Sequence, residues 1–329
     1  MLTAWLLGTG PAADPFQILL LALAIDAAIG DPEWLYRAVP HPVALVGRLV
    51  EAGQRRLNEP AAGRPARMAR GLLLVCGIGL IAGAVGWALG ALLGTIAGGW
   101  IVEAALASSL IAFRGLYDHV AAVARGLDSG LAQARAAVAH IVGRDPESLD
   151  AAGVARAAAE STAENFSDGV VAPVFWYVLF GLAGLSAYKA VNTLDSMIGH
   201  GSAHFEAFGK AAARLDDAAN WLPARLSGLI LVAAAALVPG ARASRAWRVM
   251  RRDAPKHRSV NAGWPEAALA GALNFALAGP RRYGHGLVQD HWMGDGRAAL
   301  AATDLRAALR LYLAANAILA ILLVAAIPL

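Results

Sequence analysis

The chain has 329 residues, of which 58% are hydrophobic and 16% are charged, and its mean hydropathy is +0.52. Soluble domains carry roughly a quarter charged residues, so this composition excludes an ordinary water-soluble enzyme and an intrinsically disordered chain. The formal net charge is +4, but the basic residues are spread over several connections, which argues against nucleic-acid binding. A single cysteine excludes a disulfide scaffold.

Five apolar stretches have the composition of membrane-embedded helices. The second has Glu103 as its only charged residue and is long enough for two crossings, with Gly98 and Gly99 offering a turn. The polar connections have high helix propensity and lack the alternating pattern of strands. The sequence therefore predicts a polytopic, all-α integral membrane protein with helical cytoplasmic connections, folded as a single membrane-embedded domain over residues 1–329. The apolar stretches are residues 16–29, 71–113, 169–188, 226–241 and 311–329.

Arginine and lysine are concentrated in three long connections. Residues 30–70 contain seven of them, residues 114–168 contain five, and residues 241–310 contain twelve. Because cytoplasmic connections are enriched in these residues, the pattern predicts a multi-pass protein of the bacterial inner membrane whose active site faces the cytoplasm.

The third apolar stretch contains Gly181 and Gly184, and the fourth has only 16 residues. We therefore expect residues 169–188 to bend near these glycines, or to lie buried among other helices, rather than to cross as one straight helix. Residues 192–223 would then return to the cytoplasmic face.

The first polar block lies immediately before the third apolar stretch. Glu160, Glu164 and Asp168 are four residues apart, so they share one face if the helix persists, and Asn165 lies beside them. A bound Mg²⁺ would relieve the repulsion of these carboxylates, since hard oxygen ligands suit it. The alternative is a solvated acidic helix end in which Asn165 and Ser167 act as caps.

The second block follows the third apolar stretch. Lys189, Asn192 and Ser196 have helical 3–4 spacing, with Asp195 beside them. Such a face can hold phosphate through Lys189 and position a substrate through the amide and the hydroxyl. The alternative for Lys189 is a lysine that extends along the membrane edge to reach water.

A third block contains the adjacent carboxylates Asp216 and Asp217. On a helix they point in different directions, so one of them is enough for a site, and Asp217 shares a face with Asn220 at i, i+3. Arg225 ends the block. The alternative is a surface network of aspartate and arginine.

A fourth block resembles an anion-binding loop before a proline-started helix. Lys256, Arg258, Ser259 and Asn261 lie close together here, although a basic loop also suits contact with anionic lipid headgroups. The chain has no GxxxxGK[ST] loop, so a nucleotide would need a different kind of site.

In this order, the blocks resemble the CobD/CbiB family of cobalamin biosynthesis, the adenosylcobinamide-phosphate synthases. The resemblance covers nearly the whole chain and depends on the order and spacing of short blocks rather than on any one of them. The blocks are Asp26, Gly30-Asp31-Pro32, His41-Pro42, residues 164–169, residues 192–197, Lys256 and Asn261-Ala262-Gly263.

The resemblance implies a carbon–nitrogen ligase that joins aminopropanol, or aminopropanol O-phosphate, to a propionate carboxylate of (adenosyl)cobyric acid, with ATP and Mg²⁺. We expect Glu164, Asp168, Lys189 and Asp195 to be catalytic, and Glu160, Glu164 and Asp168 to bind the metal. Expected partners are the corrinoid, the amine, membrane lipid and other cobalamin-assembly enzymes. The expected substrate-binding residues are Asp31, His41, Asn165, Asn192, Ser196, Asp217, Asn220, Arg225, Lys256, Arg258, Ser259 and Asn261.

A membrane transporter or a non-catalytic membrane scaffold is the alternative, because Asp26 and Glu103 lie within apolar stretches where they can serve an ion path. The other polar clusters lie at the ends of these stretches and in connections, which favours the enzyme.

Overall fold

The computed structural model describes residues 13–142, 145–200, 202, 204–283, 286–288 and 290–328. Within this range almost all regular structure is helical, which confirms the predicted all-α class. The chain divides into two compact units. Unit 1 contains Met1–Ala112, Ala172–Asn220 and Leu323–Leu329, and unit 2 contains Phe113–Val171 and Trp221–Leu322. The single domain over residues 1–329 stays a prediction.

Four helical segments of the described chain are long and apolar enough to cross a membrane. Many large apolar side chains of the longest continuous α-helix, such as Leu73 and Leu80, are exposed, as expected for a surface that faces lipid tails. The prediction of a polytopic membrane protein is therefore confirmed. The segments are Arg64–Gly94, Gly99–Ser129, Ala151–Gly199 and Ala302–Ala325.

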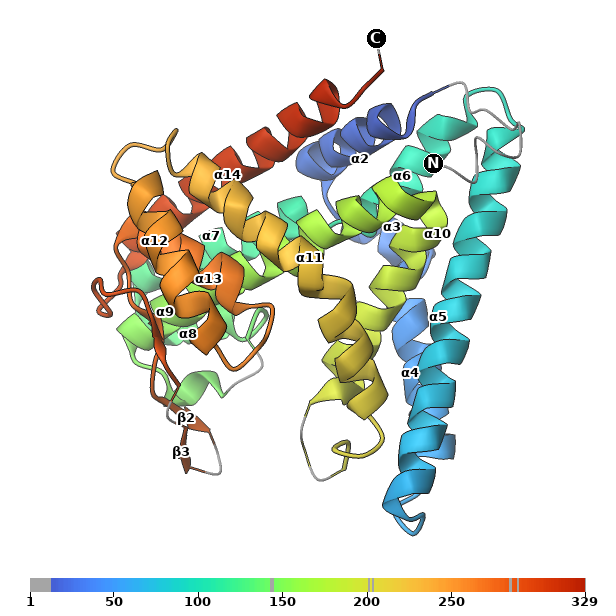
Figure 1. Cartoon of the computed structure of the whole chain (residues 1–329), viewed down its shortest axis with the longest axis horizontal. Helices are drawn as coiled ribbons and strands as arrows, with labels where there is room; N and C mark the ends of the chain where they lie inside the picture. Colours follow the sequence, from blue (N-terminus) through green and yellow to red (C-terminus); the bar gives the residue numbers. More distant parts are fainter. Residues whose placement is uncertain are drawn as a thin grey trace. The chain divides into compact units, whose positions relative to one another are not determined.

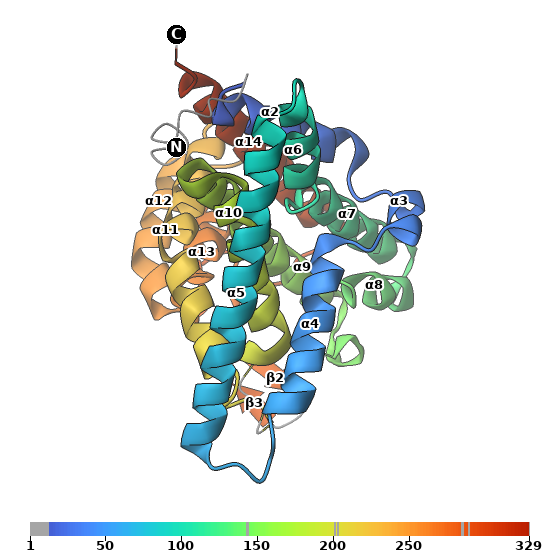
Figure 2. The same cartoon turned by 90° about the vertical axis from the view of Figure 1, so that its right-hand side faces the viewer.

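Unit 1 is built on helix α5, which packs along α10 and α4 (Figures 1 and 2). Asp14 caps the preceding apolar helix α2, because its carboxylate accepts the Phe16 N–H at 2.8 Å. The described helices of this unit are α2 (Pro15–Ile29), α3 (Glu33–Ala38), α4 (Pro42–Leu57), α5 (Arg64–Gly94), α6 (Gly99–Ser108), α10 (Ala172–Leu194), the π-helical turn η3 (Asp195–Gly199) and the first part of α11 (Lys210–Ala234).

The second apolar stretch contains the predicted turn. Gly98 has a φ of 76°, a left-handed conformation that glycine adopts without strain, between the end of α5 and the start of α6. The helical run after the turn is interrupted: α6 ends at Ser108, and the next helix begins at Phe113.

The third apolar stretch bends as predicted. Gly181, inside α10, has a φ of 61° and a ψ of −151°, which is not helical. Two features of this run are not predicted by the spacing of its residues: π-helical turns at Ser167–Val171 and at Asp195–Gly199. A π turn is rare and occurs frequently at functional sites, and each of these turns overlaps the end of one of the polar blocks singled out above.

Unit 2 surrounds the buried rings of Phe166 and Tyr312, whose centroids are 5.7 Å apart. The Tyr312 hydroxyl donates to the Phe113 carbonyl at 2.9 Å. Helices α12 and α13 lie side by side (Figure 1). The described helices of unit 2 are α7 (Phe113–Ser129), α8 (Leu131–Val138), η1 (Pro146–Ser148), α9 (Ala151–Phe166), η2 (Ser167–Val171), the second part of α11, α12 (Ala243–Asp253), η4 (Ala254–Lys256), α13 (Gly263–Leu273) and most of α14 (Ala302–Ala325).

Unit 2 also contains four very short strands. Strand β1 (Leu277–Ala278) pairs antiparallel with β4 (Trp292–Met293), and β2 (Arg281–Tyr283) pairs antiparallel with β3 (Gly286–Val288). Strands of two or three residues leave no alternating pattern in the sequence, which is why the sequence predicts only helices here.

Candidate functional site

A buried polar network links α10 to α11 in unit 1. The Asp216 side chain is 8% exposed and accepts a hydrogen bond from Asn220 Nδ2 at 3.0 Å and one from Asn192 Nδ2 at 3.4 Å. Asn220 Oδ1 in turn accepts from the Tyr188 hydroxyl at 2.9 Å. Asn192 of α10 and Asn220 of α11 thus meet at one carboxylate, and Tyr188, one helical turn before Asn192, is joined to it through Asn220.

The surroundings of Asp216 make its ionisation unusually unfavourable. Burial raises the pKa of the Asp216 carboxyl, and the nearby negative charge of Asp195 raises it further, to about 7, although the bonds from Asn220 and Asn192 act in the opposite direction. Asp216 therefore exchanges its proton near neutral pH.

The π turn at Asp195–Gly199 brings Asp195 directly over a glycine. A Cβ atom on Gly199 would lie only 1.8 Å from Asp195 Oδ1. Asp195 can occupy this position only because residue 199 has no side chain. The Ser196 hydroxyl donates to the Asn192 carbonyl at 2.9 Å, one helical turn back.

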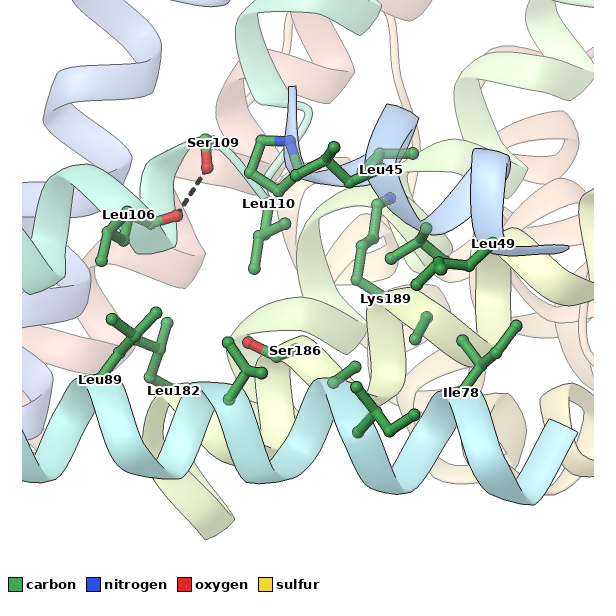
Figure 3. A pocket seen from close by; sticks show the side chains of 17 residues that line it. Leu45, Leu49, Ile78, Leu89, Leu106, Ser109, Leu110, Leu182, Ser186 and Lys189 are labelled. Carbon is green, nitrogen blue, oxygen red and sulfur yellow. Dashed lines mark hydrogen bonds between the residues drawn. The ribbon is translucent and has the colours of Figure 1, made fainter. Parts of the chain in front are cut away.

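Lys189 lies in the wall of an apolar cavity of about 240 Å³ in unit 1. Figure 3 shows Leu45, Leu110, Ser186 and Lys189 around this space, which α4, α5, α6 and α10 enclose. Asn192, which shares the predicted face with Lys189, instead bonds to Asp216 on α11.

The residue that the sequence-based argument missed is Asp216. The prediction paired Asp217 with Asn220, whereas the structure shows the Asn220 amide bonded to Asp216, at i, i−4. Asp217 is more exposed and lies 3.7 Å from Arg214. The spacing of four residues between Asp216 and Asn220 was the available signal, since both i+3 and i+4 neighbours share a helical face.

His41 and Asp31 meet near the start of α4 in unit 1. His41 Nδ1 accepts the Val43 N–H at 3.1 Å and so caps this helix. Its Nε2 lies 3.4 Å from Asp31 Oδ1. The pair therefore holds the turn before α4, and a substrate contact by either residue stays a prediction.

The first polar block lies in unit 2, where its three carboxylates have different surroundings. Glu160 is buried, and its Oε1 accepts the Ala278 N–H at 2.8 Å. Ala278 has a φ of 57°, a left-handed conformation that is strained for alanine, so this bond supports a strained turn. Glu164 is exposed and Asp168 is half-buried.

Among the residues that the structure describes, no three His, Cys, Asp or Glu side chains are grouped as a metal site. Mg²⁺ is commonly held by one or two carboxylates together with substrate phosphates, and Glu164 with Asp168 fits that donor set. Glu160 already serves the Ala278 turn, and its role at a metal stays a prediction. The Asn165 amide donates to the Ser161 carbonyl at 3.0 Å.

A second polar network lies in unit 2 and is centred on Asp253, which is 1% exposed. Its carboxylate accepts hydrogen bonds from Arg252 Nε at 2.8 Å, Arg252 Nη2 at 2.6 Å, Lys256 Nζ at 3.3 Å and the Gly294 N–H at 3.0 Å. Burial alone would raise the pKa of Asp253, but these donors outweigh burial and lower it to about 2. Lys256 is thereby held in a fixed position with its ammonium half-exposed.

The loop between Lys256 and α13 is folded tightly on itself. The Ser259 hydroxyl oxygen accepts the N–H groups of Asn261 and Ala262, at 3.2 and 3.1 Å. A Cβ atom on Gly263 would lie 2.6 Å from the Ala254 carbonyl oxygen. Arg258 is exposed beside this turn. The basic groups are therefore presented by a preorganised loop.

Arg225 lies between two indole rings in unit 2. Its guanidinium carbon is 4.1 Å from the centroid of Trp221 and 4.6 Å from that of Trp264. Such cation–π contacts hold the guanidinium in place.

A family model described as CobD/Cbib protein matches residues 19–312. The chain belongs to the CobD/CbiB family. All of the polar blocks described above lie within the part that matches.

Relatives in this family match along almost their whole length. A cobalamin biosynthesis protein CobD of Sinorhizobium sp is 49% identical over 309 residues, covering 92% of this chain and 95% of the relative. Those of Brucella suis and Rhodobacter capsulatus are 45% and 47% identical, covering 94% and 90% of this chain and 96% and 92% of the relatives. No solved structure matches this CobD/CbiB chain.

Proposed function

We propose that the chain catalyses the ATP- and Mg²⁺-dependent formation of an amide between aminopropanol, or aminopropanol O-phosphate, and a propionate carboxylate of cobyric acid. The observation that carries the proposal is membership of the CobD/CbiB family over residues 19–312, which supports a role in cobalamin biosynthesis. The enzyme acts in the bacterial inner membrane with its site open to the cytoplasm, where ATP is available.

The chemistry requires an activated carboxylate, because a carboxylate ion does not react with an amine directly. Transfer of a phosphoryl group from ATP to the carboxylate gives an acyl phosphate. The amine, after its ammonium form has lost a proton to water, attacks the acyl carbon, and phosphate leaves as the nitrogen releases a further proton. Lys256 and Arg258 bind phosphate groups, since a preorganised loop presents both cations. Glu164 and Asp168 hold Mg²⁺, which neutralises phosphate charge when it is bound.

The transporter alternative depended partly on Glu103. In the structure, Glu103 Oε1 accepts a hydrogen bond from the Tyr177 hydroxyl at 2.7 Å, within unit 1. This partner gives the carboxylate a structural role in joining α6 to α10, which favours the enzyme over an ion path.

The test uses purified protein in lipid nanodiscs, with cobyric acid, ATP, Mg²⁺ and either amine, and detects the amide by mass spectrometry. We expect product and ATP hydrolysis that both depend on the corrinoid. Hydrolysis without the corrinoid, or no amide with either amine, would contradict the proposed function.

The metal role is tested by Glu164→Gln and Asp168→Asn. Each change should lower apparent Mg²⁺ affinity on the order of 10- to 100-fold. The matched control is Glu147→Gln, which removes an exposed carboxylate that lies 3.1 Å from Arg135 and should leave the Mg²⁺ dependence unchanged. Wild-type activity of both variants at limiting Mg²⁺ would remove these carboxylates from the metal site.

A further inference from the structure

The network around Asp216 fixes the orientation of two side-chain amides. An ionised carboxylate only accepts hydrogen bonds, so both asparagines must present their Nδ2 groups to it. The Asn220 oxygen then accepts from Tyr188. Because the Asn192 nitrogen faces Asp216, the Asn192 oxygen, which is the other branch of the same planar amide, is directed away from that carboxylate.

The position of Asn192 indicates what this oxygen recognises. Asn192 is half-buried on α10, in the helical turn before the π turn that carries Asp195. Asp195 follows Asn192 by three residues, so an amide oxygen and a carboxylate belong to neighbouring turns of one helical run. Both are acceptors, and together they favour a group that donates several hydrogen bonds and carries positive charge. A primary ammonium group has three donors and that charge.

We propose that Asp216 is a positioning residue, which holds the Asn192 amide so that its oxygen accepts a hydrogen bond from the primary ammonium group of the amine substrate. The inference rests on the proposed function and identifies which part of the protein recognises the amine. Asp216 acts through Asn192 and does not itself touch the substrate.

The arrangement has a consequence for pH dependence. A protonated Asp216 becomes a donor, so the Asn192 amide can turn its oxygen inward, and the acceptor for the ammonium group is lost. The charged groups that face Asp216 are Asp195 from η3 and Asp217 on its own helix, the latter beside Arg214. Since the pKa of Asp216 is about 7, KM for the amine should rise as the pH falls through neutrality.

The experiment measures KM for aminopropanol phosphate and for ATP, from pH 6 to 9, in Asp216→Asn, Asn192→Ala and the double variant. Each single change should raise KM for the amine roughly tenfold and leave KM for ATP unchanged. The double variant should be no worse than Asn192→Ala, because Asp216 acts only through Asn192. Asp118→Asn, which removes an exposed partner of Arg114, is the control and should behave as the wild type.

Three results would overturn the inference: an unchanged KM for the amine in Asp216→Asn, multiplicative effects in the double variant, or the wild-type pH dependence of this KM in Asn192→Ala. If Asp216→Asn does not fold, the pH dependence of Asn192→Ala decides alone. Failure of the proposed function is distinct from these, because the wild type itself would then form no amide.

Discussion

Replacing Asp253 by asparagine should destabilise unit 2 by about 2 kcal/mol at pH 7. The change keeps the shape of the side chain but places an amide, which has only one acceptor oxygen, where the carboxylate accepts from Arg252, Lys256 and Gly294. The magnitude follows from the pKa of Asp253, which is lowered from 3.8 to about 2. A shift of this size corresponds to roughly 2 kcal/mol of folding free energy, and the carboxylate is buried, so solvent screens it little.

The pH dependence has a definite sign. Because the pKa is lower in the folded state than in the unfolded state, the contribution of Asp253 is fully present above about pH 4 and is lost as the pH falls from about 4 to 2. Thermal unfolding in detergent, followed by tryptophan fluorescence, should show a Tm lowered by roughly 4 to 8 °C at pH 7. The difference between the variant and the wild type should narrow below pH 4.

The matched control is Asp295→Asn. Asp295 also bonds to Arg252, at 2.6 Å, but its side chain is 72% exposed, and exposed ion pairs contribute roughly 0 to 1 kcal/mol. A Tm drop of equal size in the two variants would refute the reasoning, since it would show that burial of Asp253 adds nothing. A Tm difference between Asp253→Asn and the wild type that stays constant down to pH 2 would also refute the reasoning.

Two further predictions concern unit 1. Gly199→Ala should destabilise the protein by about 1 to 3 kcal/mol in thermal unfolding, because its Cβ would meet Asp195. Gly77→Ala on α5, whose Cβ would meet nothing within 4 Å, should be neutral or slightly stabilising. A cysteine at Ser202, in a Cys76→Ala background, should react with an impermeant thiol reagent in inverted vesicles only; reaction in intact cells would contradict a cytoplasmic position.

The helical class and the bend of α10 could be predicted because each depends on the residues of one continuous segment. The length of an apolar stretch indicates a helix, and Gly181 with Gly184 indicates where one of these helices can bend. The short strands of unit 2 could not be predicted in this way. Strand β1 forms where the Glu160 carboxylate meets the Ala278 N–H, 118 residues away in sequence, and no local pattern encodes that contact.

The polar blocks can be recognised in the sequence, but the pairing of their side chains cannot. The 3–4 spacing of the second block groups Lys189 with Asn192, yet Lys189 lines a cavity and Asn192 bonds to α11. Helical spacing defines a face, whereas the neighbouring helices decide what each side chain of that face meets. The choice between Asp216 and Asp217 depended on the same missing information.

Helix α5 is longer than the hydrocarbon core of a bilayer is thick. Its 31 residues extend about 46 Å, whereas a hydrocarbon core is about 30 Å thick. The arginines at the start of α5 favour water and headgroups over lipid tails, so we expect the roughly three turns of α5 that exceed the hydrocarbon core to project at that end. The apolar cluster of Leu74, Leu194 and Ile198 begins within that excess. We therefore expect the π turn and Asp195 to lie near headgroup depth, where the charged amine proposed as the substrate can arrive from water without entering the lipid.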